Sequence, residues 1–229
     1  MALSTAIKSL IGLGAIGGVA SSAVGVNYLL SNRGSIISEL VKSKSLNKRK
    51  LIKSSNGSED AWKKSWQAYR EVFNNTGKNP FSLALTKEIG SVTSVNATQE
   101  FMSACESWES KKVKNIEDED YQTFLKYCTR NTLMSDLVSE NLGRRVLTKG
   151  SEDSDSKGWK DAWSDYKKKN SYVQGKQGIW DLSDWSSKYN QDKAPVTFMT
   201  RCDSELKREY YDVKGEDYNR VIDWCTENI

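Results

Sequence analysis

An internal repeat at one fixed offset constrains the fold of this chain more than any other feature. Three separated aromatic and cysteine motifs recur 97 positions later in the 229-residue sequence, and every cysteine belongs to one of them. Recurrence at a constant offset is typical of repeated structural modules. We therefore predict two tandem copies of one helical module, residues 58–140 and 150–229. The predicted core residues of the two copies are Trp62, Trp66, Tyr69, Phe101, Tyr121, Trp159, Trp163, Tyr166, Phe198, Tyr218 and Trp224.

The spacing of the aromatic residues predicts helices. Trp62, Trp66, Tyr69 and Phe73 follow one another at i, i+4, i+7 and i+11, which places them on one face of a helix. The chain has only two prolines, and this favours helices over a turn-dense sandwich or barrel. The predicted fold class is therefore all-α, with an N-terminal apolar helix followed by the two helical modules.

The tryptophan stripe allows two interpretations. Flat indole faces can form a platform for sugars or nucleic-acid bases. Helical spacing instead favours burial, because residues that share one helix face pack into a core. We predict that the stripe is core, and that Trp108, which lies outside the shared pattern, is the exposed indole.

The four cysteines fit one disulfide in each copy. The two cysteines of each copy are 23 residues apart, and none belongs to a Cys-x2-Cys pair, so neither a zinc site nor a redox pair of the thioredoxin kind is indicated. Reduced cysteines buried as small apolar side chains are the alternative. Because each copy carries a complete pair, we favour Cys105–Cys128 and Cys202–Cys225, which implies an oxidising compartment.

The N-terminal segment, residues 1–33, is predicted to be a signal-anchor or transmembrane helix. No charged residue occurs from Ser9 to Asn32, and the 21 positions from Leu10 to Leu30 are mostly apolar. A helix of about 20 residues is long enough to cross a bilayer. A cleaved signal peptide is the alternative, but the apolar run continues beyond the small residues that would form its cleavage site.

A basic stretch follows, and we interpret residues 34–57 as a juxtamembrane linker. Clustered lysines and arginines bind anionic lipid headgroups, so the lipid bilayer is a predicted partner. The positive-inside rule would orient the modules inward, whereas the cysteines favour the outside. A soluble tether is the alternative interpretation. The predicted lipid-contact residues are Lys42, Lys44, Lys48, Arg49, Lys50 and Lys53.

Several classes of function are not indicated by the sequence. The chain has no histidine, so it cannot form Ser-His-Asp triads or histidine-containing zinc sites. Residues 58–229 hold 26 basic against 29 acidic residues, whereas a nucleic-acid-binding domain concentrates positive charge on its folded surface. Calcium-loop and phosphate-loop motifs do not match. We therefore expect no catalytic residue, cofactor, metal or nucleic-acid partner.

The combination of these motifs resembles a known group of proteins. A Gly/Ala-rich apolar N-terminus, the Trp62-x3-Trp66-x2-Tyr69 motif and a late Trp224-Cys225-Thr226 together are similar to the large paralogous families of uncharacterised proteins of haemotropic mycoplasmas. The resemblance covers nearly the whole chain. It implies membrane association and surface display, with antigenic variation or host contact. It supplies no catalytic or binding residues.

These observations favour a membrane-anchored, non-enzymatic surface protein. A single N-terminal span would hold two extracellular modules that contact a host surface or a protein partner, as an antigen or adhesin does. The alternative is an inward-facing membrane-associated scaffold that binds anionic lipid through its basic flank. The state of the thiols separates the two hypotheses.

Overall fold

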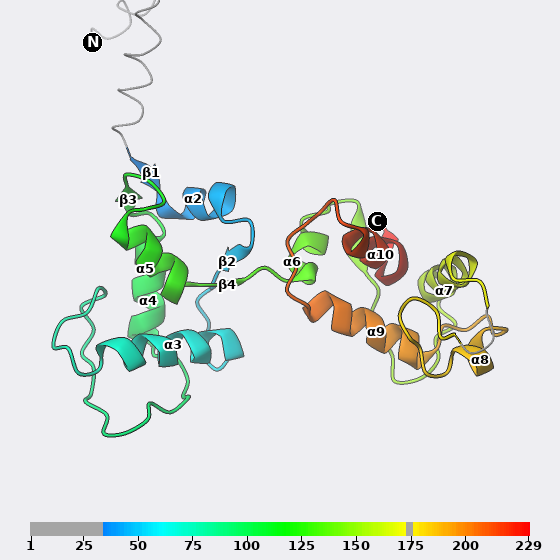
Figure 1. Ribbon diagram of the computed structural model, residues 1–229, viewed down its shortest axis with the longest axis horizontal. Helices are drawn as coiled ribbons and strands as arrows, with labels where there is room; N and C mark the ends of the chain where they lie inside the picture. The colour runs from blue at the N-terminus through cyan, green and yellow to red at the C-terminus, as the bar shows by residue number, and fades with distance from the viewer. Residues whose placement is uncertain (1–33, 173–175) are drawn as a thin grey trace, which may run out of the picture.

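The fold consists of two lobes joined by one extended segment (Figure 1). It is described for residues 34–172 and 176–229 of a computed structural model. We call residues 34–131 the first lobe and residues 132–229 the second lobe, and each has its own cluster of buried apolar side chains. The predicted membrane segment, residues 1–33, lies outside the described residues. Within them, no helix has both the length and the apolar composition that crossing a bilayer requires.

The described residues form nine helices and three small antiparallel sheets. The first lobe contains β1 (Ser35–Ile36), α2 (Ile37–Lys44), β2 (Lys48–Lys50), α3 (Asp60–Phe73), α4 (Gln99–Trp108), β3 (Lys112–Val113), α5 (Glu119–Tyr127) and β4 (Thr129–Asn131). The second lobe contains α6 (Met134–Ser139), β5 (Arg144–Val146), α7 (Lys157–Lys169), α8 (Trp185–Lys188), α9 (Val196–Lys207), α10 (Glu216–Cys225) and β6 (Thr226–Asn228).

The helical prediction is confirmed, but the chain is not all-α. β1 pairs with β3, β2 with β4, and β5 with β6, each in an antiparallel sheet of two strands. Each strand has only two or three residues. Such strands are too short to show the alternation of apolar and polar residues by which a strand is recognised in a sequence.

Tyr69 of α3 lies at the centre of the first core, with its ring fully buried. The ring stacks on Phe81 at 5.0 Å and meets Tyr127 edge to face at 5.1 Å. Its hydroxyl donates to Oδ1 of Asn79 (2.6 Å) and accepts from the backbone N–H of Phe81 (3.1 Å), so the buried polar group is satisfied. Burial raises the pKa of Tyr69 to about 12, because the phenolate would lose its hydration.

Tyr166 of α7 has the same place in the second core. Its ring stacks on Trp163 at 5.6 Å and meets Trp224 edge to face at 4.9 Å. Its hydroxyl accepts from the backbone N–H of Trp180 (3.1 Å). Burial also raises the pKa of Tyr166. Each core is therefore built around a tyrosine whose hydroxyl binds the backbone of the segment that follows the helix.

The predicted core residues lie in the two cores. Ten of the eleven are buried, and Tyr218 is partly buried, with its hydroxyl accepting from Nδ2 of Asn141 (3.3 Å). Trp108 is the least buried of the eight tryptophans, as expected, but its ring is still partly buried and meets Phe81 edge to face at 4.7 Å. The aromatic stripe is therefore packed inside the protein and offers no platform to a ligand.

One disulfide closes each lobe, as predicted. Cys105 of α4 bonds to Cys128 at the end of α5, and Cys202 of α9 bonds to Cys225 of α10. The Cα atoms of the two pairs are 5.3 and 5.4 Å apart, and all four residues are buried. A disulfide that closes a loop of this length stabilises a fold by about 3 kcal/mol. The alternative of four reduced cysteines is not what the structure shows.

The boundaries of the lobes differ from the predicted module boundaries. Residues 34–57, which we expected to be a linker, place Ile37 and Val41 of α2 in the first core. α6 likewise places Met134 and Val138 in the second core, although the first copy was expected to continue to residue 140. In both helices an i, i+4 apolar pair faces the core. The boundary between the two cores therefore lies between Asn131 and Met134 in the sequence.

Candidate functional site

The predicted lipid-contact residues all belong to folded parts of the first lobe, and four of the six line one cavity. Ile37 and Val41 point into the core, so the last turn of α2 exposes Lys42 and Lys44 to solvent. The other four cations follow on β2 and just after it: Lys48, Arg49, Lys50 and Lys53. These six cations are thus held by a helix and a strand, not by a flexible tether.

Four of these six cations have partners within the protein. Lys42 and Lys44 make no ion pair with any described residue. Exposed ion pairs contribute about 0.2–1 kcal/mol each, so an anionic ligand can compete for them at small cost. The pairs are Arg49–Glu140 (3.0 Å), Lys50–Glu109 (2.5 Å) and Lys53–Glu106 (3.6 Å), and Lys48 donates to Oδ1 of Asn131 (2.7 Å).

Thr132 joins the two lobes and is 1% exposed. Its N–H donates to the carbonyl of Asn47 in the first lobe (2.9 Å), and its carbonyl accepts from the N–H of Tyr210 in the second lobe (2.9 Å). Its hydroxyl donates to the carbonyl of Leu46 (2.9 Å) and accepts from Arg49 (3.1 Å). The extended segment that contains Thr132 and joins the lobes is therefore hydrogen-bonded to both of them.

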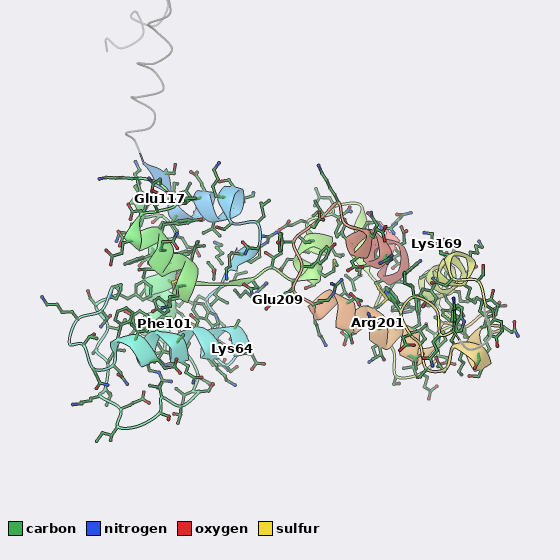
Figure 2. All side chains as sticks on the ribbon, in the orientation of Figure 1. Lys64, Phe101, Glu117, Lys169, Arg201 and Glu209 are labelled. Carbon is green, nitrogen blue, oxygen red and sulfur yellow. A yellow bond between two sulfur atoms is a disulfide. The ribbon has the colours of Figure 1, made fainter. Side chains whose placement is uncertain are left out.

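Side chains reinforce this junction. Glu209 of the second lobe accepts from Nδ2 of Asn131 (2.7 Å), and it lies between the lobes in the view of Figure 2. Arg130 of β4 forms two hydrogen bonds with Asp136 of α6, at 2.6 and 2.8 Å. Burial is the largest single influence and raises the pKa of Asp136, but the hydrogen bonds from Arg130 and from the N–H of Leu133, together with the nearby positive charges, outweigh it and lower the pKa of Asp136.

A cavity of about 470 Å³ opens beside this junction. Its walls come from α2, from β2 and the turn before it, and from the end of α6 in the second lobe. The walls are mainly aliphatic, because the stems of the lysines line the cavity together with apolar side chains. Residues that line it include Val41, Lys42, Leu46, Lys48, Arg49 and Glu140.

A second cavity, of about 370 Å³, is polar and lies in the second lobe between α7 and the β5–β6 sheet. Its carboxylates are engaged by neighbouring cations. Lys169 bonds to both Asp165 (2.9 Å) and Asp223 (2.7 Å), and the hydrogen bond to Asp223, followed by that to Asp165, raises the pKa of Lys169. Across the described ranges, no group of three or more Cys, Asp or Glu side chains is placed to hold a metal ion.

A turn that closes each core was not predicted from the sequence. Phe81 stacks on Tyr69, Trp180 packs at a tilt against Tyr166, and each is followed by a residue with positive φ, Ser82 at 54° and Asp181 at 55°. The two turns are 99 positions apart, whereas the other motifs are 97 apart. A search at one constant offset therefore cannot align them.

No family model, no curated protein and no solved structure matches this chain. The site must therefore be interpreted from its own chemistry. The structure brings together, at the junction of the lobes, exposed cations, an aliphatic cavity and a hydrogen-bonded joint. Such an arrangement can bind an anionic or amphipathic partner. Glu140 and Thr132 also belong to this arrangement of cations, cavity and joint. Neither is part of a motif that could be recognised in the sequence.

Proposed function

We propose that this chain is a membrane-anchored, non-enzymatic surface protein that presents two helical lobes to a host surface or a protein partner. The observation that carries the proposal is the buried disulfide in each lobe. Disulfides persist in oxidising compartments and are rare in the cytosol. They therefore favour lobes on the outer side of the membrane over the inward-facing scaffold.

We further propose that the lobes are two copies of one module, residues 34–131 and 132–229. Backbone pairing supports this, because Ile36 pairs with Lys112 and Leu133 pairs with Glu209, and each residue of the second pair lies 97 positions after its counterpart. The disulfides obey the same offset. Duplication would double the displayed surface by repeating one core arrangement.

The charge of the two lobes supports an orientation. The first lobe has 16 basic and 12 acidic residues, a net charge of +4, whereas the second has 16 basic and 18 acidic residues, a net charge of −2. An anionic membrane attracts the first and repels the second. In the proposed arrangement the first lobe lies next to the bilayer and the second lobe projects away from it.

A role in contact, not catalysis, is supported by the chemistry of the chain. It has no histidine to serve as a general base. The four carboxylates that line the polar cavity of the second lobe, Asp161, Asp165, Asp223 and Glu227, are all paired with cations of the same lobe. We therefore assign them to ion pairing within the lobe.

Protease treatment of intact cells that make the full chain tests this proposal. Trypsin should cleave at exposed lysines such as Lys87 and Lys214 while the cells are intact, and a cytoplasmic protein should stay uncut as the control. Cleavage of this chain only after lysis would contradict outward display. It would instead support the inward-facing scaffold.

A further inference from the structure

We infer that the cavity at the junction of the lobes binds the headgroup of one anionic phospholipid, with the phosphate near Lys42 and the upper part of an acyl chain against Leu46. This inference rests on the membrane anchoring proposed above. It goes further by replacing a diffuse basic stretch with one built site that holds a single molecule.

The charge of the cavity is complementary to a phosphate. Four cations line it, Lys42, Lys48, Arg49 and Lys50, with two carboxylates, Glu39 and Glu140, which leaves a net charge of +2. Arg49 pairs with Glu140, and Lys50 pairs with Glu109 outside the cavity, whereas Lys42 and Lys48 have no ion-pair partner in the part of the chain that the structure describes. Lys42 is therefore available to an anionic group, and Lys48, whose ammonium donates one hydrogen bond to Oδ1 of Asn131, keeps two further donors.

The walls of the cavity fit an acyl chain. Val41 and Leu46 contribute branched aliphatic side chains, and the lysine stems extend the apolar surface. A volume of about 470 Å³ lies within the range of small-ligand sites, about 300–1,000 Å³. A free phosphate would satisfy the cations and leave these walls in contact with water. An amphipathic anion matches both parts of the site.

The site is also close to the proposed membrane surface. α2 begins at Ile37, four positions after the last residue of the predicted membrane segment. Lys42 lies five residues further along the helix, which is about 8 Å along its axis from Ile37. This is comparable to the distance of about 8–10 Å over which charges act at physiological salt.

The second lobe shows why the cavity needs both lobes. Leu142 lies two residues before β5, just as Leu46 lies two residues before β2. The side chain of Leu142 is 91% exposed, whereas that of Leu46 is 58% exposed. In the first lobe, Glu140 from the end of α6 covers the groove between α2 and β2. Leu142, by contrast, projects into solvent beside β5.

Two lysines of the same helix turn provide a matched test. Lys42 and Lys44 are both exposed, and neither forms an ion pair with a described residue, but Lys42 lines the cavity and Lys44 does not. The full chain and the variants Lys42→Glu and Lys44→Glu are each assembled in nanodiscs of phosphatidylcholine with a minor fraction of phosphatidylglycerol. Native mass spectrometry then counts the phosphatidylglycerol molecules that each released chain retains.

We expect the unaltered chain to retain one phosphatidylglycerol in preference to phosphatidylcholine. Lys42→Glu should lower this occupancy by about tenfold, since one lysine near a membrane surface is worth about 1 kcal/mol and the variant also adds a repulsive charge. Lys44→Glu should change it by less than about twofold, because a charge outside the cavity acts through water. Leu46→Ser should weaken retention, and Leu142→Ser should not.

Three results would overturn the inference: equal losses for the two lysine variants, no preference for phosphatidylglycerol, or equal effects of the two leucine variants. Intact disulfides and an unchanged circular dichroism spectrum show that each variant is folded. Flotation with neutral phosphatidylcholine vesicles tests the anchoring separately. If the chain does not float, the anchoring fails, and titration of the free chain with water-soluble dihexanoyl phosphatidylglycerol then decides whether the cavity binds the headgroup.

Discussion

The two lobes place equivalent aromatic residues around a central tyrosine, but they close their cores with different middle segments. In the first lobe, residues 74–98 contain no helix, and Arg70 holds them by pairing with Glu88 and donating to the carbonyl of Thr93. In the second lobe, α8 supplies Trp185, which meets Trp163 edge to face at 5.6 Å. The difference shows that an aromatic core of this kind tolerates change in the segment that covers it.

A conserved geometry inside this variable segment explains the tolerance. Phe81 and Trp180 both place a ring on the central tyrosine and donate their N–H groups to its hydroxyl. Outside these turns, the ion pair between Arg70 and Glu88 holds the first segment. The second segment is held by the indole of Trp185, which packs against Trp163. The segment can therefore differ in sequence and structure while the turn keeps the core closed.

Removing the closing ring should have the largest effect. Trp180→Ala should lower the free energy of unfolding of the second lobe by about 3–5 kcal/mol, and Phe81→Ala should do the same in the first lobe, because each leaves a cavity beside the central tyrosine. Hydrogen exchange followed by mass spectrometry measures each lobe separately. Equal loss of protection in both lobes from one variant would show that the lobes do not have separate cores.

Removing one disulfide should have the next largest effect. The double variant Cys202→Ala, Cys225→Ala should destabilise the second lobe by about 3 kcal/mol, and Cys105→Ala, Cys128→Ala should destabilise the first lobe by a similar amount, since both close loops of equal length. Denaturation with urea, followed by near-ultraviolet circular dichroism, measures the loss. A large difference between the two variants would contradict the equivalence of the lobes.

Thr132→Val should loosen the joint and leave both cores intact. The substitution removes the hydroxyl that donates to the carbonyl of Leu46 and accepts from Arg49, which costs about 0.5–1.5 kcal/mol, because Arg49 and the carbonyl of Leu46 also bond to each other and stay paired. Fluorescence energy transfer between dyes at the exposed Ile89 and Val213 should show a broader distance distribution. An unchanged distribution would mean that the hydroxyl does not hold the lobes together.

Acid should weaken the second lobe more than the first, and this effect should be the smallest. Hydrogen bonds from Lys188 and Arg208 lower the pKa values of Asp153 and Asp217, both in the second lobe. A carboxylate with a lowered pKa in the folded state stabilises the protein above its unfolded value of about 3.9, and this stability is lost as the pH falls through the folded value.

Thermal unfolding of the second lobe should therefore shift to lower temperature below about pH 4 by more than that of the first. Lys188→Met, which removes one of these partners, should reduce the difference between the lobes. A first lobe that is more sensitive to acid would contradict the assignment of these carboxylates.

The aromatic core and the disulfides could be predicted from the sequence because helical spacing and a constant offset carry direct information about contacts. The lobe boundaries could not, since Ile37 and Met134 are equivalent in packing but differ in identity. The closing turns were missed because two extra residues change their offset. The junction cavity forms where Glu140 of the second lobe packs beside a groove of the first lobe. A local sequence pattern carries no information about a contact between residues so far apart in the chain.

The outward display proposed above requires that this chain carries one disulfide per lobe in the cell. The most direct test is differential alkylation: cells are lysed in denaturant with a first thiol reagent, the chain is reduced, and a second reagent of different mass is added. The account predicts that Cys105, Cys128, Cys202 and Cys225 all carry the second reagent. If all four carry the first reagent, the thiols are reduced in the cell, and the account is contradicted.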